Sequence, residues 1–114
     1  MADADELAAR KCKPCEGGVT ALAPDAVPAF MAALHPDWQL AADGRSIART
    51  FEFLNFYRTI AFVNAVAWVA NMEDHHPDLE VGYSRCLVRW WTHAASGLTE
   101  NDFICAARVD RLEK

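Results

Sequence analysis

The chain has 114 residues, 53% of them hydrophobic and 24% charged, a balance that predicts one globular domain and excludes a disordered chain. The formal net charge is −5 and no dense cluster of lysine and arginine occurs, which argues against a nucleic-acid-binding protein. The apolar stretch at 60–70 is interrupted by Asn64 and is too short for a membrane span, and the N-terminus lacks a signal-peptide pattern. We therefore expect a soluble, cytoplasmic protein.

Residues 1–22 contain few bulky apolar groups and are predicted to form a flexible lead-in to a domain at 23–114. Cys12 and Cys15 form one CxxC pair in this lead-in. A zinc ribbon would need a second pair, and a thioredoxin-like site would need a βαβ context, so we interpret the pair as part of a flexible tail. The other two cysteines, Cys86 and Cys105, lie in apolar stretches, and we expect both side chains to be buried.

The first predicted helix begins at Pro24, after which bulky apolar residues recur at helical spacing until Pro36 ends the helix. Two short strands are predicted next, at 38–40 and 47–53. The Asp43-Gly44 pair between them is typical of a hairpin turn. The sequence therefore predicts a helix followed by a β-hairpin.

A long helix is predicted to follow, with Asn55 as its N-cap. Pro77 disfavours helical geometry at His76, so the helix is expected to end near Glu73. The apolar stripe expected to face a sheet consists of Phe56, Ile60, Val63, Ala67 and Ala70, widened by Phe62, Val66 and Val69.

Residues 83–93 alternate with a period of two, which predicts a strand. The face assigned to the core consists of Cys86, Val88, Trp90 and Thr92. The opposite face carries Leu87 and Trp91 among arginines, and we expect part of it to contact another subunit.

A last helix is predicted after Thr99, which forms a capping-box pattern with Asp102, and it is expected to run to about Arg111. Its inward residues are expected to be Phe103, Ile104 and Ala107. The order of helix, two strands, helix, strand and helix predicts an α+β two-layer sandwich on an antiparallel sheet.

Three of the four histidines, His75, His76 and His93, fall within nineteen residues of one another. The predicted layout brings the end of the long helix and the end of the strand to one cleft, where imidazoles could transfer protons at neutral pH. A zinc site that adds Glu73 to these histidines is a less favoured alternative, because adjacent histidines diverge and no HExxH spacing occurs. His35, which precedes a proline, is interpreted as a helix terminator at the surface.

This pattern resembles the signature of the pterin-4a-carbinolamine dehydratases. The matching spacing is His75-His76-Pro77, five residues to Tyr83, nine more to His93 and eight more to Asp102. The segment 97–102 and the turn at 36–38 are also similar to that family, and the resemblance covers about residues 24–110. The family often has a carboxylate four residues before His75, where this chain has Asn71.

The resemblance implies an antiparallel four-stranded sheet covered on one face by about three helices. Only three strands are distinct in this sequence. We expect the fourth to come from dividing residues 45–53 and their neighbours into strands differently. The resemblance also implies a homo-oligomer, either a dimer or a tetramer.

The implied activity is that of a hydro-lyase without cofactor or metal, which dehydrates 4a-hydroxytetrahydrobiopterin to quinonoid dihydropterin and water in tetrahydrobiopterin recycling. The implied catalytic residues are His75, His76 and His93. The implied substrate-binding residues are His75, His76, Pro77, Thr92, His93, Ala94 and Ala95. Asp102 is implied to cap the last helix and to orient His93.

Two other functions remain open from the sequence. Some relatives of this family stabilise the dimer of a homeodomain transcription factor, so a binding module is one alternative. A dehydratase-like pterin protein of molybdenum-cofactor metabolism is the other. Three intact histidines favour the enzyme over the binding module.

Overall fold

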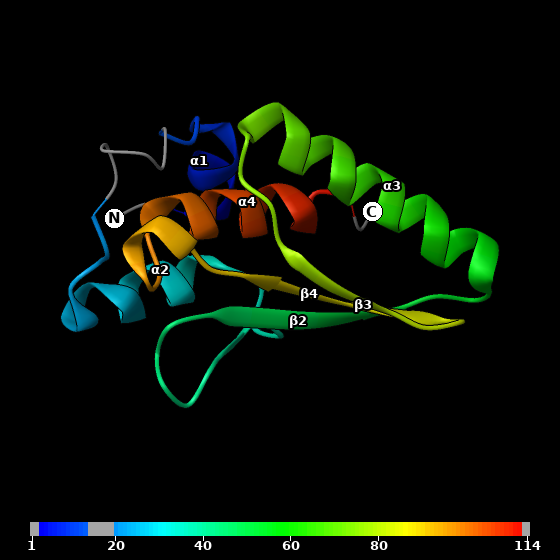
Figure 1. Ribbon diagram of the computed structural model, residues 1–114, viewed down its shortest axis with the longest axis horizontal. Helices are drawn as coiled ribbons and strands as arrows, with labels where there is room; N and C mark the ends of the chain where they lie inside the picture. The colour runs from blue at the N-terminus through cyan, green and yellow to red at the C-terminus, as the bar shows by residue number, and fades with distance from the viewer. Residues whose placement is uncertain (1–2, 14–19, 113–114) are drawn as a thin grey trace.

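Four antiparallel strands form a sheet in the order β1-β2-β4-β3, and the helices cover one face of it (Figure 1). The computed structural model describes residues 3–13 and 20–112 of the chain. The strands are β1 (Gln39–Leu40), β2 (Ile47–Glu52), β3 (Asp78–Val81) and β4 (Arg85–Trp90). The predicted α+β two-layer fold is confirmed.

Apart from the first, the helices begin and end close to the residues that local sequence predicts. They are α1 (Ala4–Ala9), α2 (Val27–Ala33), α3 (Phe56–Glu73) and α4 (Glu100–Asp110), with 3-10 turns η1 (Pro24–Ala26) and η2 (His93–Ala95). The Asn55 side chain accepts a hydrogen bond from the N–H of Arg58 and caps α3 as predicted. At the start of α4, the N–H of Thr99 donates to the Asp102 carboxylate, which belongs to the predicted capping box.

The hairpin of β1 and β2 closes around the predicted Asp43-Gly44 turn, where Gly44 has a φ of 72° that suits glycine. β2 pairs with β4 so that Ile47 lies opposite Trp90 and Phe51 lies opposite Cys86. The face of β4 that the sequence assigned to the core is buried, and it consists of Cys86, Val88, Trp90 and Thr92.

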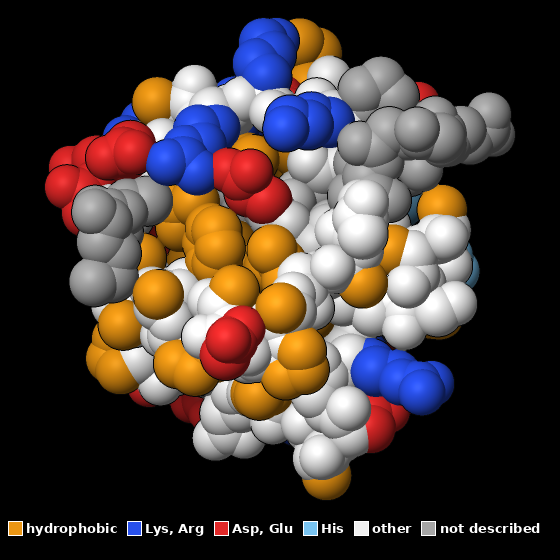
Figure 2. Space-filling model, turned by 90° about the vertical axis from the view of Figure 1, so that its left-hand side faces the viewer, with side chains coloured by type: hydrophobic (Ala, Val, Ile, Leu, Met, Phe, Trp, Pro, Cys, Tyr) orange, Lys and Arg blue, Asp and Glu red, His pale blue; other side chains and the backbone are white. Residues whose placement is uncertain are grey.

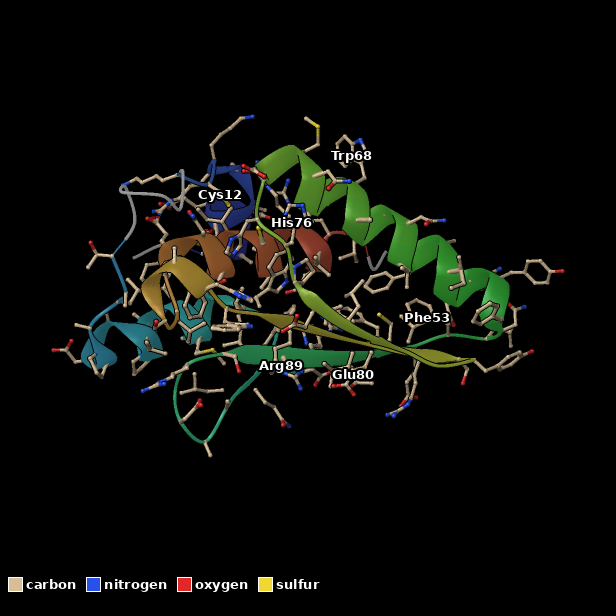
Figure 3. The ribbon with its side chains drawn as sticks, viewed as in Figure 1. Cys12, Phe53, Trp68, His76, Glu80 and Arg89 are labelled. Atoms are coloured by element: carbon tan, nitrogen blue, oxygen red, sulfur yellow. The ribbon has the colours of Figure 1, made fainter. Side chains whose placement is uncertain are left out.

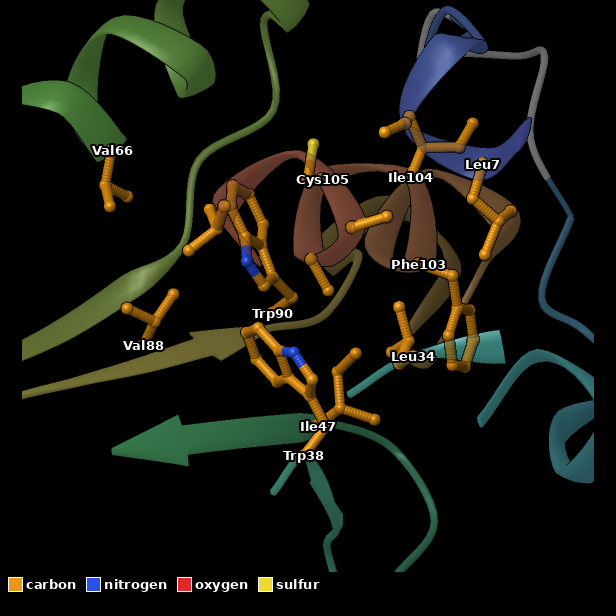
Figure 4. Close-up of a cluster of buried hydrophobic side chains, with 14 of the residues drawn as sticks. Leu7, Leu34, Trp38, Ile47, Val66, Val88, Trp90, Phe103, Ile104 and Cys105 are labelled. Carbon is orange, nitrogen blue, oxygen red and sulfur yellow. The ribbon is translucent and has the colours of Figure 1, made fainter. Parts of the chain in front are cut away.

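The core lies between the sheet and the helices, and Figure 4 shows side chains from both layers meeting there. Phe51 of β2 packs against Phe62 of α3 with ring centroids 4.6 Å apart. Phe103 of α4 stacks on Phe30 of α2 at 5.1 Å. The first contact holds α3 on the sheet and the second holds α2 against α4, because aromatic side chains bury large apolar areas.

The face of α3 that packs on the sheet differs from the predicted stripe. The buried residues are Thr59, Phe62, Val66, Val69, Ala70 and Glu73. Phe56 and Ala67, which were expected to face inward, are exposed. Because apolar residues surround most of this helix, periodicity did not single out one face, and contacts such as that of Phe62 with Phe51 select it. No helix in the described ranges is both long enough and apolar enough to cross a membrane.

The fourth strand is β3, which begins directly after Pro77, and the expectation that it lay near 45–53 was wrong. β3 pairs only with β4 and forms one edge of the sheet. Asp78–Val81 do alternate polar and apolar residues, but this run of four is short and only Leu79 is half-buried, so it is a weak strand signal in sequence.

The lead-in contains structure that the sequence did not predict. Ala4–Ala9 form α1, which packs against α4, and the side chain of Leu7 is fully buried. Arg10 pairs with Glu100 on α4, and Arg108 donates to the carbonyl of Arg10 at 2.9 Å. The described part of the lead-in therefore packs on the domain. Cys15 lies outside the described residues.

Candidate active site

The turn that ends α3 sets the directions of the two adjacent histidines. Asp74 has a left-handed conformation with a φ of 51°, and the N–H of His75 donates to the carbonyl of Ala70 at 3.1 Å. This is the Schellman pattern of helix termination, and Asp tolerates the left-handed conformation better than most residues. After this turn His75 is buried and His76 is exposed. The two imidazoles therefore occupy different environments.

His75 forms a short hydrogen bond with Asp102 inside the protein. Its Nε2 lies 2.6 Å from Oδ1 of Asp102, in the first turn of α4. The side chain of Asp102 is fully buried and that of His75 is 5% exposed. Because an ionised carboxylate only accepts hydrogen bonds, Nε2 of His75 carries the hydrogen. This hydrogen bond occupies Nε2 of the imidazole.

Asp102 is the centre of a buried hydrogen-bond network. Its Oδ2 accepts from Thr92 Oγ1 at 2.8 Å and from the N–H of Thr99 at 2.9 Å. The Thr99 and Thr92 hydroxyls lie 2.8 Å apart, and since Thr92 donates to Asp102, Thr99 donates to Thr92. Asp102 was expected to orient His93, but its hydrogen bond is with His75, because the first turn of α4 faces the end of α3 at this point.

The indole ring of Trp90 stacks on the imidazole ring of His75. The two rings are nearly parallel, with centroids 5.5 Å apart and an angle of 13° between their planes. Trp90 is fully buried, and its Nε1 has no hydrogen-bond partner among the described residues. The stack and the Asp102 hydrogen bond together restrict rotation of the His75 imidazole.

His93 is exposed and begins η2, which is separated from the end of β4 by Trp91 and Thr92. Its ring stacks on Trp91 with centroids 3.8 Å apart. The Nε1 of Trp91 donates to Asp78 Oδ2 at 3.0 Å, which ties this stack to the start of β3. Trp90 and Trp91 lie on opposite faces of the sheet, since side chains alternate along a strand. His75 and His93 therefore share one end of the sheet but stack on opposite faces of it.

His76 lies between the end of α3 and the start of β3, as Figure 3 shows. Its Nε2 donates to Oδ1 of Asn71 at 3.1 Å. The acceptor in this hydrogen bond is therefore a neutral amide oxygen. His76 is two residues before Asp78, so the Asp78–Trp91 contact brings it to the same end of the sheet as His93.

The other predicted binding residues lie at this end as well. Pro77 is half-buried between His76 and β3, and Thr92 is buried. Ala94 and Ala95 lie in η2 with His93, where His93 and Ala94 are exposed and Ala95 is half-buried. Within the described residues, no group of three or more His, Cys, Asp or Glu side chains is placed to hold a metal ion.

Glu73 supports the site, and the sequence interpretation gave it no such role. Its side chain is buried in the last turn of α3, where Oε1 accepts from the N–H of Cys12 at 2.9 Å. Its Oε2 lies 3.1 Å from NH1 of Arg108 on α4. Glu73 follows Ala70 at a helical spacing of three, so a correct choice of the inward face of α3 would have found it.

Two clefts flank this end of the molecule. One, of about 360 Å³, lies beside the His93–Trp91 stack and is lined by Asp43, Arg45, Ser46, Arg89 and Trp91. A second, of about 280 Å³, lies between the hairpin turn, the start of α2 and Gly97-Leu98. Figure 2 shows hydrophobic side chains gathered on the end of the molecule that carries α2.

The sequence matches proteins of one family. A family profile described as pterin 4 alpha carbinolamine dehydratase matches residues 20–112. A relative from Nitrosomonas eutropha, provisionally named pterin-4-alpha-carbinolamine dehydratase, is 58% identical over 112 residues, which is 98% of this chain and 97% of the relative. A relative from Legionella pneumophila with the same provisional name is 51% identical over 107 residues, which is 94% of this chain and 95% of the relative.

The fold matches solved structures with related descriptions. A crystal structure described as transcriptional coactivator/pterin dehydratase from Brucella melitensis has a TM-score of 0.77 and 31% identity, and the match covers 83% of this chain and 100% of that one. A pterin dehydratase-like protein, described as a RuBisCO assembly factor in the alpha-carboxysome, has a TM-score of 0.59 and 26% identity over 68% of this chain and 90% of that one.

Proposed function

Because this chain belongs to the pterin 4 alpha carbinolamine dehydratase family, a family of hydro-lyases, we propose that it dehydrates 4a-hydroxytetrahydrobiopterin in the cytoplasm. The products are quinonoid dihydropterin and water, and the reaction serves the recycling of tetrahydrobiopterin after aromatic amino acid hydroxylation. The observation that carries this proposal is the buried His75–Asp102 hydrogen bond of 2.6 Å, which holds one imidazole in a fixed orientation and tautomer.

The reaction needs two proton transfers. Hydroxide is a poor leaving group, so the 4a-hydroxyl must receive a proton as its bond to carbon breaks. The proton on N5 must be accepted as the C4a–N5 double bond forms. Imidazoles perform both transfers at neutral pH, and each transfer contributes typically about 10² to 10⁴ in rate. No cofactor or metal is needed for this chemistry.

His75 and His93 are the two imidazoles to which we assign these transfers. Asp102 and Trp90 orient His75, whereas Trp91 orients His93 by stacking at 3.8 Å. Acid and base partners in enzymes commonly differ in environment, and a buried, carboxylate-linked histidine and an exposed, stacked one differ in this way. His76 and Pro77 would hold the pterin, and the backbone at 92–95 would hydrogen-bond its ring.

The test is a spectroscopic dehydration assay on enzymatically generated carbinolamine. His75→Ala is expected to lower the rate at least about tenfold while leaving the circular dichroism spectrum unchanged. His35→Ala is the matched control, since His35 is exposed and its ring nitrogen accepts from the N–H of Asp37 far from this site along the chain. A His75→Ala variant with the wild-type rate would remove this residue from the mechanism.

We further propose that the protein is a homo-oligomer, a dimer or a tetramer. The outward face of α3 carries Tyr57, Trp68 and Met72, whose exposed fractions are 88%, 62% and 55%. Figure 3 shows Trp68 pointing away from the sheet. The outer sheet face adds Leu87 and Trp91, both half-buried. Trp68 and Met72 are neighbours on the helix because they are four residues apart, and exposed apolar clusters commonly mark contact surfaces.

The binding function of some relatives is a second candidate for the same α3 face, because exposed aromatic side chains suit protein contacts. The two candidates differ in what His75→Ala does. Loss of the dehydration rate supports the enzyme, whereas a partner contact through α3 would be unaffected by a change at the buried histidine.

A further inference from the structure

Two cysteines that are 93 residues apart in sequence lie in contact. The Sγ atoms of Cys12 and Cys105 are 3.6 Å apart, and neither residue is in a disulfide. Cys105 is fully buried in α4, and Figure 4 shows its sulfur directed away from the sheet. Cys12 is half-buried in the segment after α1, and Figure 3 shows it on that side of α4. One thiol is therefore fixed in a helix and the other lies at the surface beside it.

We propose that Cys12 and Cys105 form a reversible disulfide when the protein meets a peroxide, and that this bond locks the N-terminal segment onto α4. The sulfurs must approach by about 1.5 Å to reach the bond length of about 2.05 Å. Cys12 can supply this movement, because it lies outside α1 (Ala4–Ala9) and outside the other helices and strands of the described chain. Cys86 is buried in β4 and its Sγ contacts the carbonyl of Leu87.

The chemistry balances with hydrogen peroxide as the oxidant. The Cys12 thiolate attacks one peroxide oxygen, which gives a sulfenic acid at Cys12 and releases water after protonation. The Cys105 sulfur then attacks the Cys12 sulfur, displacing the hydroxyl as a second water. Two thiols lose two electrons in total and the peroxide gains them. The hydrogen bond to Cys12 and burial raise the pKa of the Cys105 thiol, so Cys12 is the thiol that reacts with peroxide first.

Hydrogen bonds connect Cys12 and Lys13 to residues that neighbour His75 and Asp102 in the sequence. The N–H of Cys12 donates to Glu73, two residues before His75. The N–H of Lys13 donates to Asn101 Oδ1 at 3.0 Å, and Asn101 Nδ2 donates back to the Lys13 carbonyl at 2.8 Å. Asn101 directly precedes Asp102. A Cys12–Cys105 disulfide would covalently attach to α4 the segment that hydrogen-bonds the end of α3 and the start of α4. Its formation does not depend on the proposed function.

The experiment treats the purified full-length protein with about one equivalent of hydrogen peroxide, followed by alkylation of remaining thiols and peptide mapping by mass spectrometry. We expect a Cys12–Cys105 cross-linked peptide, a mass loss of about 2 Da on the intact chain and recovery of both thiols with dithiothreitol. Because the closed loop is long, the thermal midpoint should rise by roughly 5 °C or more on oxidation and fall back on reduction.

Four variants make the test specific. Cys105→Ala and Cys12→Ser should each lose the cross-link and the thermal shift, and either one serves if the other fails to fold. Cys86→Ala is the matched control and should keep both effects. Cys15→Ser removes the competing thiol of the CxxC pair and should also keep both. A cross-link between Cys12 and Cys15, or oxidation of Cys12 to sulfinic acid without any cross-link, would overturn the proposal.

Discussion

Replacement of Asp102 by Asn tests the proposed role of the buried hydrogen-bond network most directly. Oδ2 of Asp102 accepts two hydrogen bonds, from Thr92 and Thr99, so the single amide oxygen of Asn is expected to stay at that position. The amide NH₂ group then faces Nε2 of His75, where the carboxylate Oδ1 accepted. Two donors cannot share this hydrogen bond, so His75 must change tautomer and carry its hydrogen on Nδ1.

The expected consequence is a large loss of activity with a small loss of stability. With the wrong tautomer, His75 cannot accept a proton at Nδ1, and the rate should fall by about 10² to 10⁴. The fold should lose only about 1 to 2 kcal/mol of unfolding free energy, because the volume and most hydrogen bonds remain. Asp102→Ala leaves three buried donors without an acceptor and should cost about 4 kcal/mol, at 1 to 3 kcal/mol for each donor after partial relaxation.

The measurements are urea unfolding, followed by circular dichroism at one fixed protein concentration, and the dehydration rate at saturating substrate. Asp110→Asn is the matched control, because Asp110 is also an α4 carboxylate and accepts from Trp38 at 2.9 Å and from Arg49 at 2.6 Å. The Asp110→Asn variant should lose a similar amount of unfolding free energy and keep the wild-type dehydration rate. An Asp102→Asn protein that retains a rate within about threefold of the wild type would refute the tautomer argument.

The remaining predictions concern the second histidine, metals and assembly. His93→Ala should lower the dehydration rate at least about tenfold without a change in fold, and an unchanged rate would exclude it as an acid or base. Dialysis against a strong chelator should leave the rate unchanged, whereas a stoichiometric metal whose removal abolishes activity would favour a metal mechanism. Trp68→Glu on α3 and Trp91→Glu on the outer sheet face should each weaken the oligomer in sedimentation experiments, and a concentration-independent wild-type monomer would contradict the assembly. Activity in Trp68→Glu should remain, since that residue lies outside the site.

Local sequence signals predicted most elements of the fold because each depends on neighbouring residues. Asn55 caps α3, Asp43-Gly44 closes the hairpin, and Thr99 with Asp102 begins α4. Each of these signals satisfies backbone groups within a few residues, so it can be identified without knowledge of the tertiary structure. The positions of the three clustered histidines at element ends followed from the same boundaries.

The supports of the site depend on contacts between residues that are distant in sequence. The partner of Asp102 is His75, 27 residues away, and no local signal favours His75 over His93 as that partner. The contact between Cys12 and Cys105 spans 93 residues and requires α1 to pack on α4. Contacts of this kind depend on how the helices and the sheet pack together, and local sequence propensity does not determine that packing.

Local sequence patterns are enough to predict the α+β class, the order of the main helices and strands, and the histidine pattern that marks the family. Three features follow only from packing: which face of α3 is buried, that the short segment at 78–81 forms an edge strand, and that His75 and His93 stack on opposite faces of the sheet. The physical reason is that periodicity fixes local conformation, whereas burial and hydrogen-bond partners are chosen by packing against distant parts of the chain.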